Sequence, residues 1–157
     1  MDYLIPLDRH ALDALGIPQP WRFGRADRVR FGELDPLNHV NNVAYLGWLE
    51  TARVAYFDWT GFPRGAEDGA RLVLIGTSIR YHAPVNPKDS YVVCVRTTGY
   101  RNTSFTTEYG IYVDGRLTTT GEIVMVCVEN DLITKRPIPP DVVEAFRRDG
   151  ATDQRDL

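Results

Sequence analysis

The longest regular pattern of apolar residues lies in Val43–Trp59. Leu46, Leu49 and Tyr56–Phe57 recur at three- and four-residue intervals, which predicts an α-helix. Asn41 and Asn42 before it are candidate N-caps, and the glycine after Thr60 suits the left-handed position that ends a helix. Other apolar residues extend around the circumference (Val43, Tyr45, Trp48, Ala52, Val54). Such a helix is expected to be buried on most sides.

Alternating apolar and polar positions predict five strands around this helix. The first is Arg25–Glu33, and a loop over Phe62–Gly69 separates the helix from the rest. The other four strands are Arg71–His82, Lys88–Thr98, Thr103–Val113 and Arg116–Glu129, with Asp114-Gly115 as a hairpin turn. This order predicts an α+β fold, in which a mostly antiparallel five-stranded sheet is wrapped around one long central helix. The outer face of that sheet needs solvent or a partner subunit.

Both ends of the chain carry shorter elements. Asp8–Leu15 is compatible with a short helix, and the prolines that follow it interrupt regular structure. We therefore expect residues 1–24 to form an N-terminal extension packed on a single domain of residues 25–149. A short amphipathic helix is expected at Val142–Arg148, and residues 150–157 form a charged tail.

Composition narrows the classes of function. A net charge of −3 over 157 residues argues against nucleic-acid binding, which requires a basic face. The chain has no apolar run long enough to cross a membrane and no signal-peptide pattern at its start, so we expect a cytoplasmic protein without membrane association. Cys94 and Cys127 lack metal-site spacing and predict two buried thiols, with a disulfide or a catalytic thiol as alternatives.

The densest group of chemically useful side chains lies in VRFGELDPLNHVNNVAYLGWLETARVAYF. This stretch resembles the opening motif of the hotdog-fold acyl-CoA thioesterases of the 4-hydroxybenzoyl-CoA thioesterase type. The resemblance continues through RYHAPVNPKD, NTSFTTEYGIYVDGRLTTTGEIVMVCV and KRPIPPDVVEAF, and covers about Asp27 to Phe146. It implies the hotdog fold, in agreement with the order of elements. It also implies a homodimer or homotetramer with an acyl-CoA substrate bound between two subunits.

The resemblance assigns roles to individual residues. The acid of the turn before the helix carries the chemistry in this family, and that position is Asp35. The backbone N–H at the start of the helix, which falls on Asn42, polarises the thioester carbonyl. The chain departs from the family pattern at Asn38, where glycine is usual, although Asn also tolerates left-handed geometry.

Physical chemistry also favours this turn as the site of thioester hydrolysis. Thioester hydrolysis needs a nucleophile at the carbonyl carbon, stabilisation of the oxyanion and room for water. Asp35 can attack directly or activate a water molecule, and a helix N-terminus offers free N–H groups to an oxyanion. From the residues alone, Asp35 as an ordinary turn or cap residue stays open, because Asp-Pro is common in turns.

Three further residues near the turn are candidates. His39 can bond Asp35 or the substrate carbonyl, or it can hold loop carbonyls in a structural role. Glu33 shares a face with Asp35 on an extended backbone, where like charges would raise one pKa, but we expect it to be a solvated surface acid. Glu50 is the alternative catalytic residue, because one hotdog branch uses a helix carboxylate; otherwise we expect it buried against a polar partner such as Arg53.

The substrate-binding candidates lie on the helix and on a later hairpin. Tyr45 and Trp48 can line an acyl pocket, although core or dimer packing would also explain them. Arg101 can meet a CoA phosphate, and Thr103 or Ser104 can bond the pantetheine arm. Solvated hairpin positions are the alternative for these three residues.

The sequence therefore predicts a thioester hydrolase that releases CoA and a carboxylic acid. We expect no cofactor beyond water and no metal, because the three histidines lack ligand spacing. Two alternatives remain. One is a non-catalytic acyl-CoA or acyl-carrier binding module on the same fold. The other is a hotdog hydratase or dehydratase, which would need a His paired with a carboxylate.

Overall fold

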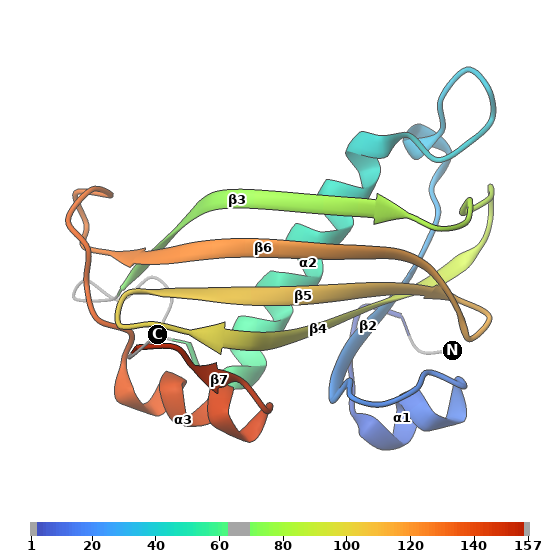
Figure 1. Cartoon of the computed structure of the whole chain (residues 1–157). Coiled ribbons are helices and arrows are strands. Elements are labelled where there is room, and N and C mark those ends of the chain that lie inside the picture. Colours follow the sequence, from blue (N-terminus) through green and yellow to red (C-terminus); the bar gives the residue numbers. More distant parts are fainter. Residues whose placement is uncertain (1–2, 63–69, 156–157) are drawn as a thin grey trace. The chain divides into compact units, whose positions relative to one another are not determined.

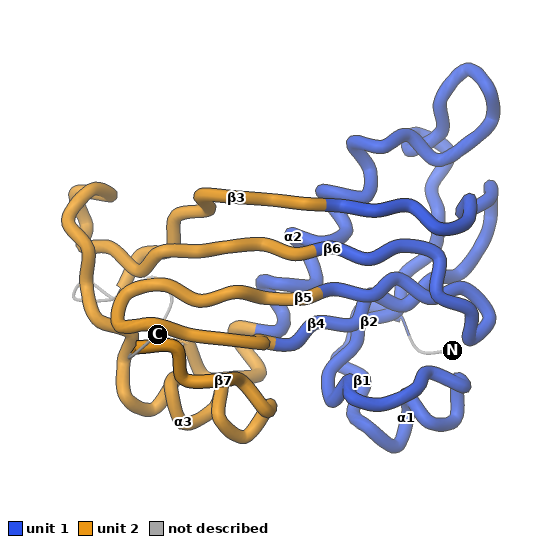
Figure 2. The backbone as a smooth tube through the Cα atoms, in the orientation of Figure 1, with its two compact units in different colours: residues 1–56, 79–96, 109–121 blue, residues 57–78, 97–108, 122–157 orange. Residues whose placement is uncertain are grey.

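The computed structural model describes residues 3–62 and 70–155. The chain divides into two compact units (Figure 2). Unit 1 comprises residues 1–56, 79–96 and 109–121, and unit 2 comprises residues 57–78, 97–108 and 122–157. The predicted loop at Phe62–Gly69 lies almost entirely outside the described residues.

Four long strands follow one another between helices α2 and α3, and the shorter elements lie toward the two ends of the chain (Figure 1). The helices are α1 (Arg9–Ala14), the 3-10 helix η1 (Phe31–Glu33), α2 (Asn42–Thr60) and α3 (Pro140–Arg148). The strands are β1 (Pro6–Leu7), β2 (Phe23–Arg28), β3 (Arg71–Tyr81), β4 (Ser90–Tyr100), β5 (Ser104–Val113), β6 (Arg116–Val128) and β7 (Thr152–Asp153). None of the helices described is both long and apolar enough to cross a membrane.

The sheet has seven strands in the described chain, two more than predicted. Its order is β1-β2-β4-β5-β6-β3, and β7 pairs with β4 in parallel. β2 runs antiparallel to β4, with Phe23 opposite Val95 and Arg28 opposite Ser90. The added strands β1 and β7 have two residues each, which is too short for an alternating pattern to reveal them.

In unit 1, β4 packs on both of its faces because successive side chains point to opposite sides of a sheet. Tyr91 stacks on Trp48 of α2, with ring centroids 3.9 Å apart. On the other face, Val92 and Cys94 join an apolar cluster with four residues of the N-terminal extension (Leu7, Leu12, Ile17 and Trp21), with Ala26 of β2 and with Tyr112 of β5. The extension therefore packs on the sheet, as expected, while the predicted domain boundaries stay a prediction.

In unit 2, a chain of aromatic rings holds the helices to the sheet. Phe57 of α2 lies 5.8 Å from Phe105 of β5, and Phe105 lies 4.9 Å from Phe146 of α3, measured between ring centroids. α3 begins at Pro140, where a missing N–H is tolerated, and it includes the predicted helix Val142–Arg148.

The prediction for the first strand was wrong. β2 ends at Arg28, and residues Phe31–Glu33 form the 3-10 helix η1 instead. The Glu33 carboxylate accepts a hydrogen bond from the backbone N–H of Arg30 at 2.7 Å, which stabilises this turn. Phe31 lies in this 3-10 helix and is 92% exposed.

The predicted helix was correct to within one residue at each end, and Gly61 has the left-handed φ of +78° that ends α2. The expectation that α2 is buried on most sides was only partly correct. Val43, Leu46 and Val54 are exposed. Cys94 and Cys127 are both buried and free, as predicted.

Candidate active site

The segment between η1 and α2 is a short closed turn. Leu34 and Val40 form an antiparallel bridge, and the backbone N–H of Asp35 donates to the carbonyl of His39 at 2.8 Å. Asn38 donates to the carbonyl of Asp35 at 3.0 Å and has a φ of +60°. Asn38 therefore adopts the left-handed conformation that asparagine tolerates better than other non-glycine residues.

The turn holds the Asp35 carboxylate by one of its two oxygens. Oδ1 accepts hydrogen bonds from the backbone N–H groups of Leu37 at 2.9 Å and His39 at 3.0 Å. Among the described residues, no group donates a hydrogen bond to Oδ2. The carboxylate is thus fixed in orientation, with one oxygen available for chemistry.

The start of α2 offers a free backbone donor. The side chain of Asn41 caps the helix, because its Oδ1 accepts from the N–H of Val43 at 3.0 Å. Asn42 is the first residue of α2, and its N–H has no acceptor within residues 3–62 and 70–155. This N–H lies at the positive end of the helix dipole.

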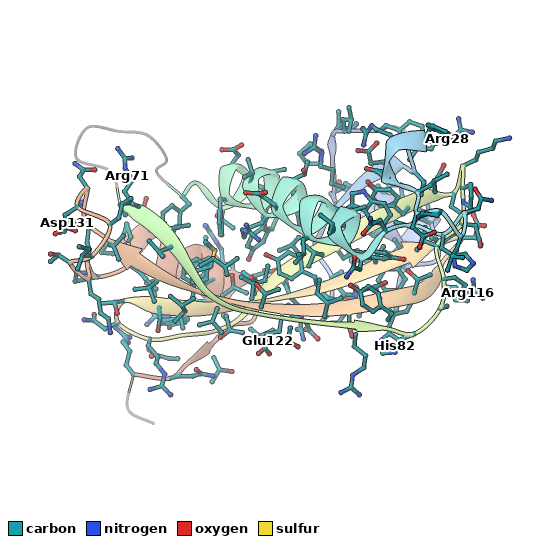
Figure 3. The ribbon with its side chains drawn as sticks, turned by 90° about the horizontal axis from the view of Figure 1, so that it is seen from above. Arg28, Arg71, His82, Arg116, Glu122 and Asp131 are labelled. Atoms are coloured by element: carbon teal, nitrogen blue, oxygen red, sulfur yellow. The ribbon has the colours of Figure 1, made fainter. Side chains whose placement is uncertain are left out.

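A cavity of about 680 Å³ brings these groups together. Its wall comprises the turn, the start of α2 and the segment after β3 (Asp35, His39, Val40, Asn41, Asn42, Tyr45, Tyr81, His82, Ala83, Pro84, Val85). His82, labelled in Figure 3, follows the last residue of β3, and its ring is hydrogen-bonded to the hydroxyl of Thr120 at 2.9 Å. All of these residues belong to unit 1.

The profile of the "Thioesterase-like superfamily" matches residues 29–146, about three quarters of the chain. The chain belongs to this family. The matched region includes the turn, α2 and every residue of the cavity. Family membership confirms the resemblance to hotdog thioesterases and the predicted enzyme class, thioester hydrolase.

Individual members of the thioesterase-like family agree with this assignment. A thioesterase superfamily structure from Jannaschia sp. CCS1 is 37% identical, has a TM-score of 0.91 and covers 96% of this chain and 98% of its own. A Thermus thermophilus thioesterase solved with coenzyme A and Zn is 31% identical, with a TM-score of 0.73 and coverage of 82% and 99%. The acyl-CoA thioester hydrolase YbgC of Escherichia coli O6:H1 is 23% identical over 77% of this chain and 92% of its own.

Tyr45 and Tyr81 form an aromatic part of the cavity wall in this thioesterase-like protein. Their rings meet edge to face, with centroids 5.0 Å apart. Burial raises the pKa of the Tyr45 phenol, and a hydrogen bond with the backbone of Val85 offsets part of that effect. Tyr45 therefore stays protonated at neutral pH and presents a neutral, polar-tipped ring.

Trp48, predicted beside Tyr45, lines a second and smaller cavity of about 240 Å³. Its indole N–H donates to Oε1 of Glu33 at 2.9 Å. Arg30 pairs with Asp27 at 2.9 Å in the same cavity wall. Burial, together with Asp27 and Glu33, raises the pKa of Tyr91 well above its usual range. In the wall of this second cavity, the charges of Asp27 and Glu33 are therefore paired with that of Arg30.

The remaining predicted residues lie elsewhere. Glu50 is exposed on α2 and is absent from the lining of both cavities, so the expectation of a buried carboxylate was wrong. Arg101, Thr103 and Ser104 belong to unit 2, where Arg101 and Thr103 lie in the turn between β4 and β5 and Ser104 begins β5. The N–H of Arg101 donates to the carbonyl of Ser104 at 2.7 Å.

Sequence reasoning did not assign Tyr81 and Val85 to the site, and it left Glu33 as a surface acid. Tyr81 is the last residue of an alternating strand. The alternation predicts that Tyr81 lies at the end of the sheet, but it does not predict which residues Tyr81 contacts. The part of the chain that the structure describes has no group of three or more His, Cys, Asp or Glu side chains that could hold a metal ion.

Proposed function

We propose that this chain hydrolyses an acyl-CoA thioester to CoA and a carboxylic acid. Asp35 is the base or nucleophile, and the backbone N–H of Asn42 is the oxyanion donor. The observation that carries the proposal is the large cavity, in whose wall both groups lie with their reactive atoms unpaired by other described residues.

The two groups supply complementary parts of the reaction. The free oxygen of Asp35 can attack the thioester carbon, or it can take a proton from a water molecule that attacks instead. Charge then develops on the carbonyl oxygen, which the N–H of Asn42 and the helix dipole stabilise. The hydrogen bonds to Oδ1 of Asp35 keep the carboxylate oriented through both steps.

The rest of the cavity wall suits a bound acyl-CoA. His39 lies beside Asp35, and Tyr45 with Tyr81 offers an aromatic surface to the acyl group. The Thermus thermophilus relative was solved with coenzyme A, and the Escherichia coli relative is named an acyl-CoA thioester hydrolase. These names support a CoA thioester as the substrate. Arg101, Thr103 and Ser104 remain proposed contacts for the CoA moiety.

A hydratase finds less support in the geometry. That reaction would use an imidazole ring paired with a carboxylate, but His39 contacts Asp35 through its backbone N–H. The His39 ring has no hydrogen bond to any residue in the described ranges.

The test is a panel of acyl-CoA thioesters with detection of the released thiol, applied to the protein and to Asp35→Asn. The amide oxygen of Asn can still accept the two backbone N–H bonds, so the turn is expected to remain intact. We expect CoA release by the wild type and a loss of about 10²–10⁴-fold in the variant, the range for losing a general base. Full turnover by Asp35→Asn would exclude Asp35 and direct attention to Glu50. Binding without CoA release by the wild type would indicate a binding module.

We also propose that the protein is a cytoplasmic homodimer or homotetramer. β3 is the last strand of the sheet order, and its residues Leu74 and Ile75 are exposed. An apolar strand edge of this kind favours pairing with another chain. Light scattering during size-exclusion chromatography will give the oligomeric state.

A further inference from the structure

Glu33 lies outside the lining of the large cavity, but its backbone closes the turn that carries the proposed site. The carbonyl of Glu33 accepts a hydrogen bond from the N–H of Asn41 at 2.8 Å. Glu33 precedes Asp35 by two residues, and Asn41 directly precedes Asn42. The Glu33–Asn41 hydrogen bond therefore closes the base of the turn, next to both the proposed acid and the proposed oxyanion donor.

The side chain of Glu33 connects this base of the turn to helix α2. Oε1 accepts from the indole N–H of Trp48 at 2.9 Å, and Oε2 accepts from the backbone N–H of Arg30 at 2.7 Å. Trp48 lies in the second turn of α2, and its ring is stacked on Tyr91 of β4 at an interplanar angle of 22°. Trp48 is thus a fixed donor, and Glu33 bonds to it across 15 residues of sequence.

The surroundings of Glu33 show that it is not a solvated surface acid. Its side chain is 19% exposed, and the Arg30 guanidinium lies 3.6 Å from it. Both carboxylate oxygens are used, each by a different donor. An amide would offer a single acceptor oxygen, so a carboxylate is the group that satisfies both donors.

We propose that Glu33 is a positioning residue, which holds the Asp35 carboxylate at a fixed separation from the Asn42 N–H by tying their turn to Trp48. Its effect on catalysis rests on the function proposed above. Glu33 does not touch the substrate in this scheme and acts only through the turn. A displacement of about 1 Å at reacting groups can lower a rate by about 100-fold.

The kinetic test compares Glu33→Ala, Glu33→Gln and Trp48→Phe with the control Glu144→Ala, which removes an exposed acid from α3. For Glu33→Ala we expect kcat to fall by about 10- to 100-fold, while KM changes by less than about threefold, because substrate contacts outside the turn persist. The loss of kcat should be smaller in Glu33→Gln than in Glu33→Ala, because the amide oxygen of Gln can still accept one hydrogen bond. Combining Glu33→Ala with Trp48→Phe should lower kcat little further than Glu33→Ala alone, because Glu33→Ala already removes the hydrogen bond to Trp48.

A second measurement does not depend on turnover. Hydrogen exchange of peptides covering residues 34–42 should be faster in Glu33→Ala than in the wild type, with unchanged exchange in β5. Wild-type kcat in Glu33→Ala, or unchanged exchange in residues 34–42, overturns the positioning role.

The two proposals fail in different ways. If Asp35→Asn keeps full turnover, the proposed role of Asp35 fails, and the exchange experiment alone then decides whether Glu33 holds the turn. If Asp35→Asn is inactive but Glu33→Ala behaves as the wild type, only the positioning role fails. Glu144→Ala should match the wild type in kcat, KM and exchange.

Discussion

Two carboxylates separated by a single residue, Glu33 and Asp35, lie in very different surroundings. Both oxygens of Glu33 accept hydrogen bonds, one from an indole and one from a backbone N–H. Only one oxygen of Asp35 does so among the described residues. The second oxygen of Asp35 is therefore free to meet water or a ligand, whereas both oxygens of Glu33 are used within the protein. The comparison favours Asp35, the acid left partly unpaired, as the proposed reactive group, and Glu33, its fully bonded neighbour, as the proposed support.

Two of the cavities in unit 1 repeat this contrast. The larger contains the unpaired oxygen of Asp35 and the unpaired N–H of Asn42. In the smaller, Arg30 pairs with Asp27, and Arg25 donates to the carbonyl of Thr51 at 3.2 Å. The first cavity offers a ligand an unpaired acceptor and an unpaired donor. In the second, the carboxylates of Asp27 and Glu33 are bonded within the protein, while the buried Nε of Arg25 lacks a partner among the described residues.

The sharpest test of the comparison measures activity and stability in the same variants. Asp35→Asn should lose about 10²–10⁴-fold in kcat/KM while its free energy of unfolding stays within about 0.5 kcal/mol of the wild type. Glu33→Ala should lose about 1–3 kcal/mol of stability, because two donors lose a charged acceptor. Urea unfolding with parallel kinetics gives both quantities. If Glu33→Ala matched Asp35→Asn in activity without losing stability, the distinction between the two acids would be wrong.

Asn42→Pro removes the proposed oxyanion donor with little change to the helix. Proline is well tolerated at the first helical position, where the N–H has no intrahelical partner. We expect kcat to fall by about 10²–10³-fold, as for the loss of one oxyanion donor. Asn42→Ala keeps the backbone N–H and should retain nearly full activity. Equal kinetics in the two variants would exclude this N–H, and circular dichroism will verify that α2 is intact.

Asn38 tests the geometry of the turn that holds Asp35. Its left-handed φ of +60° disfavours a β-branched side chain, so Asn38→Val should cost about 1–2 kcal/mol in the free energy of unfolding. Asn38→Gly should be neutral to within about 0.5 kcal/mol, because glycine accepts this conformation without strain. Urea unfolding of both variants measures the difference. A neutral Asn38→Val would show that the turn adopts another conformation in solution.

The smallest effect concerns the cysteines. Burial raises the pKa of both Cys94 and Cys127, so at pH 8 each is a thiol rather than the reactive thiolate. The native protein should therefore release almost no colour from a thiol-exchange reagent, and the unfolded protein should titrate two thiols per chain. A fast-reacting thiol in the native state would reopen a catalytic role for cysteine.

Elements with strong periodicity and clear ends were predictable from the sequence. Helix α2 carries apolar residues at helical spacing, a capping Asn41 and a left-handed Gly61, and its ends matched to within one residue. The four long strands after it matched to within two residues, because each is ten or more residues long and rich in β-branched and apolar residues between clear turn signals. The position of Asp35 in the site turn followed from the family motif rather than from periodicity.

The elements that were missed depend on contacts distant in sequence or on short local bonds. Alternation continued past Arg28, but the bond from Arg30 to the Glu33 carboxylate turned the backbone into η1. The role of Glu33 requires Trp48, and no local pattern relates an acid in a turn to an indole in the next helix. Likewise, Glu50 has helical spacing that suits burial, yet it is exposed.

The N-terminal extension gives part of the sheet a second covering layer, as a second sheet does in a β-sandwich. Leu12 packs so closely on Gly24 that a Cβ at that glycine would lie 2.7 Å from the Leu12 side chain. Without residues 7–21, the apolar strand face with Val92 and Cys94 would meet water, and such surfaces promote aggregation. A shortened protein that begins at the family-matched region would therefore be expected to precipitate, and the minimal stable protein includes the extension.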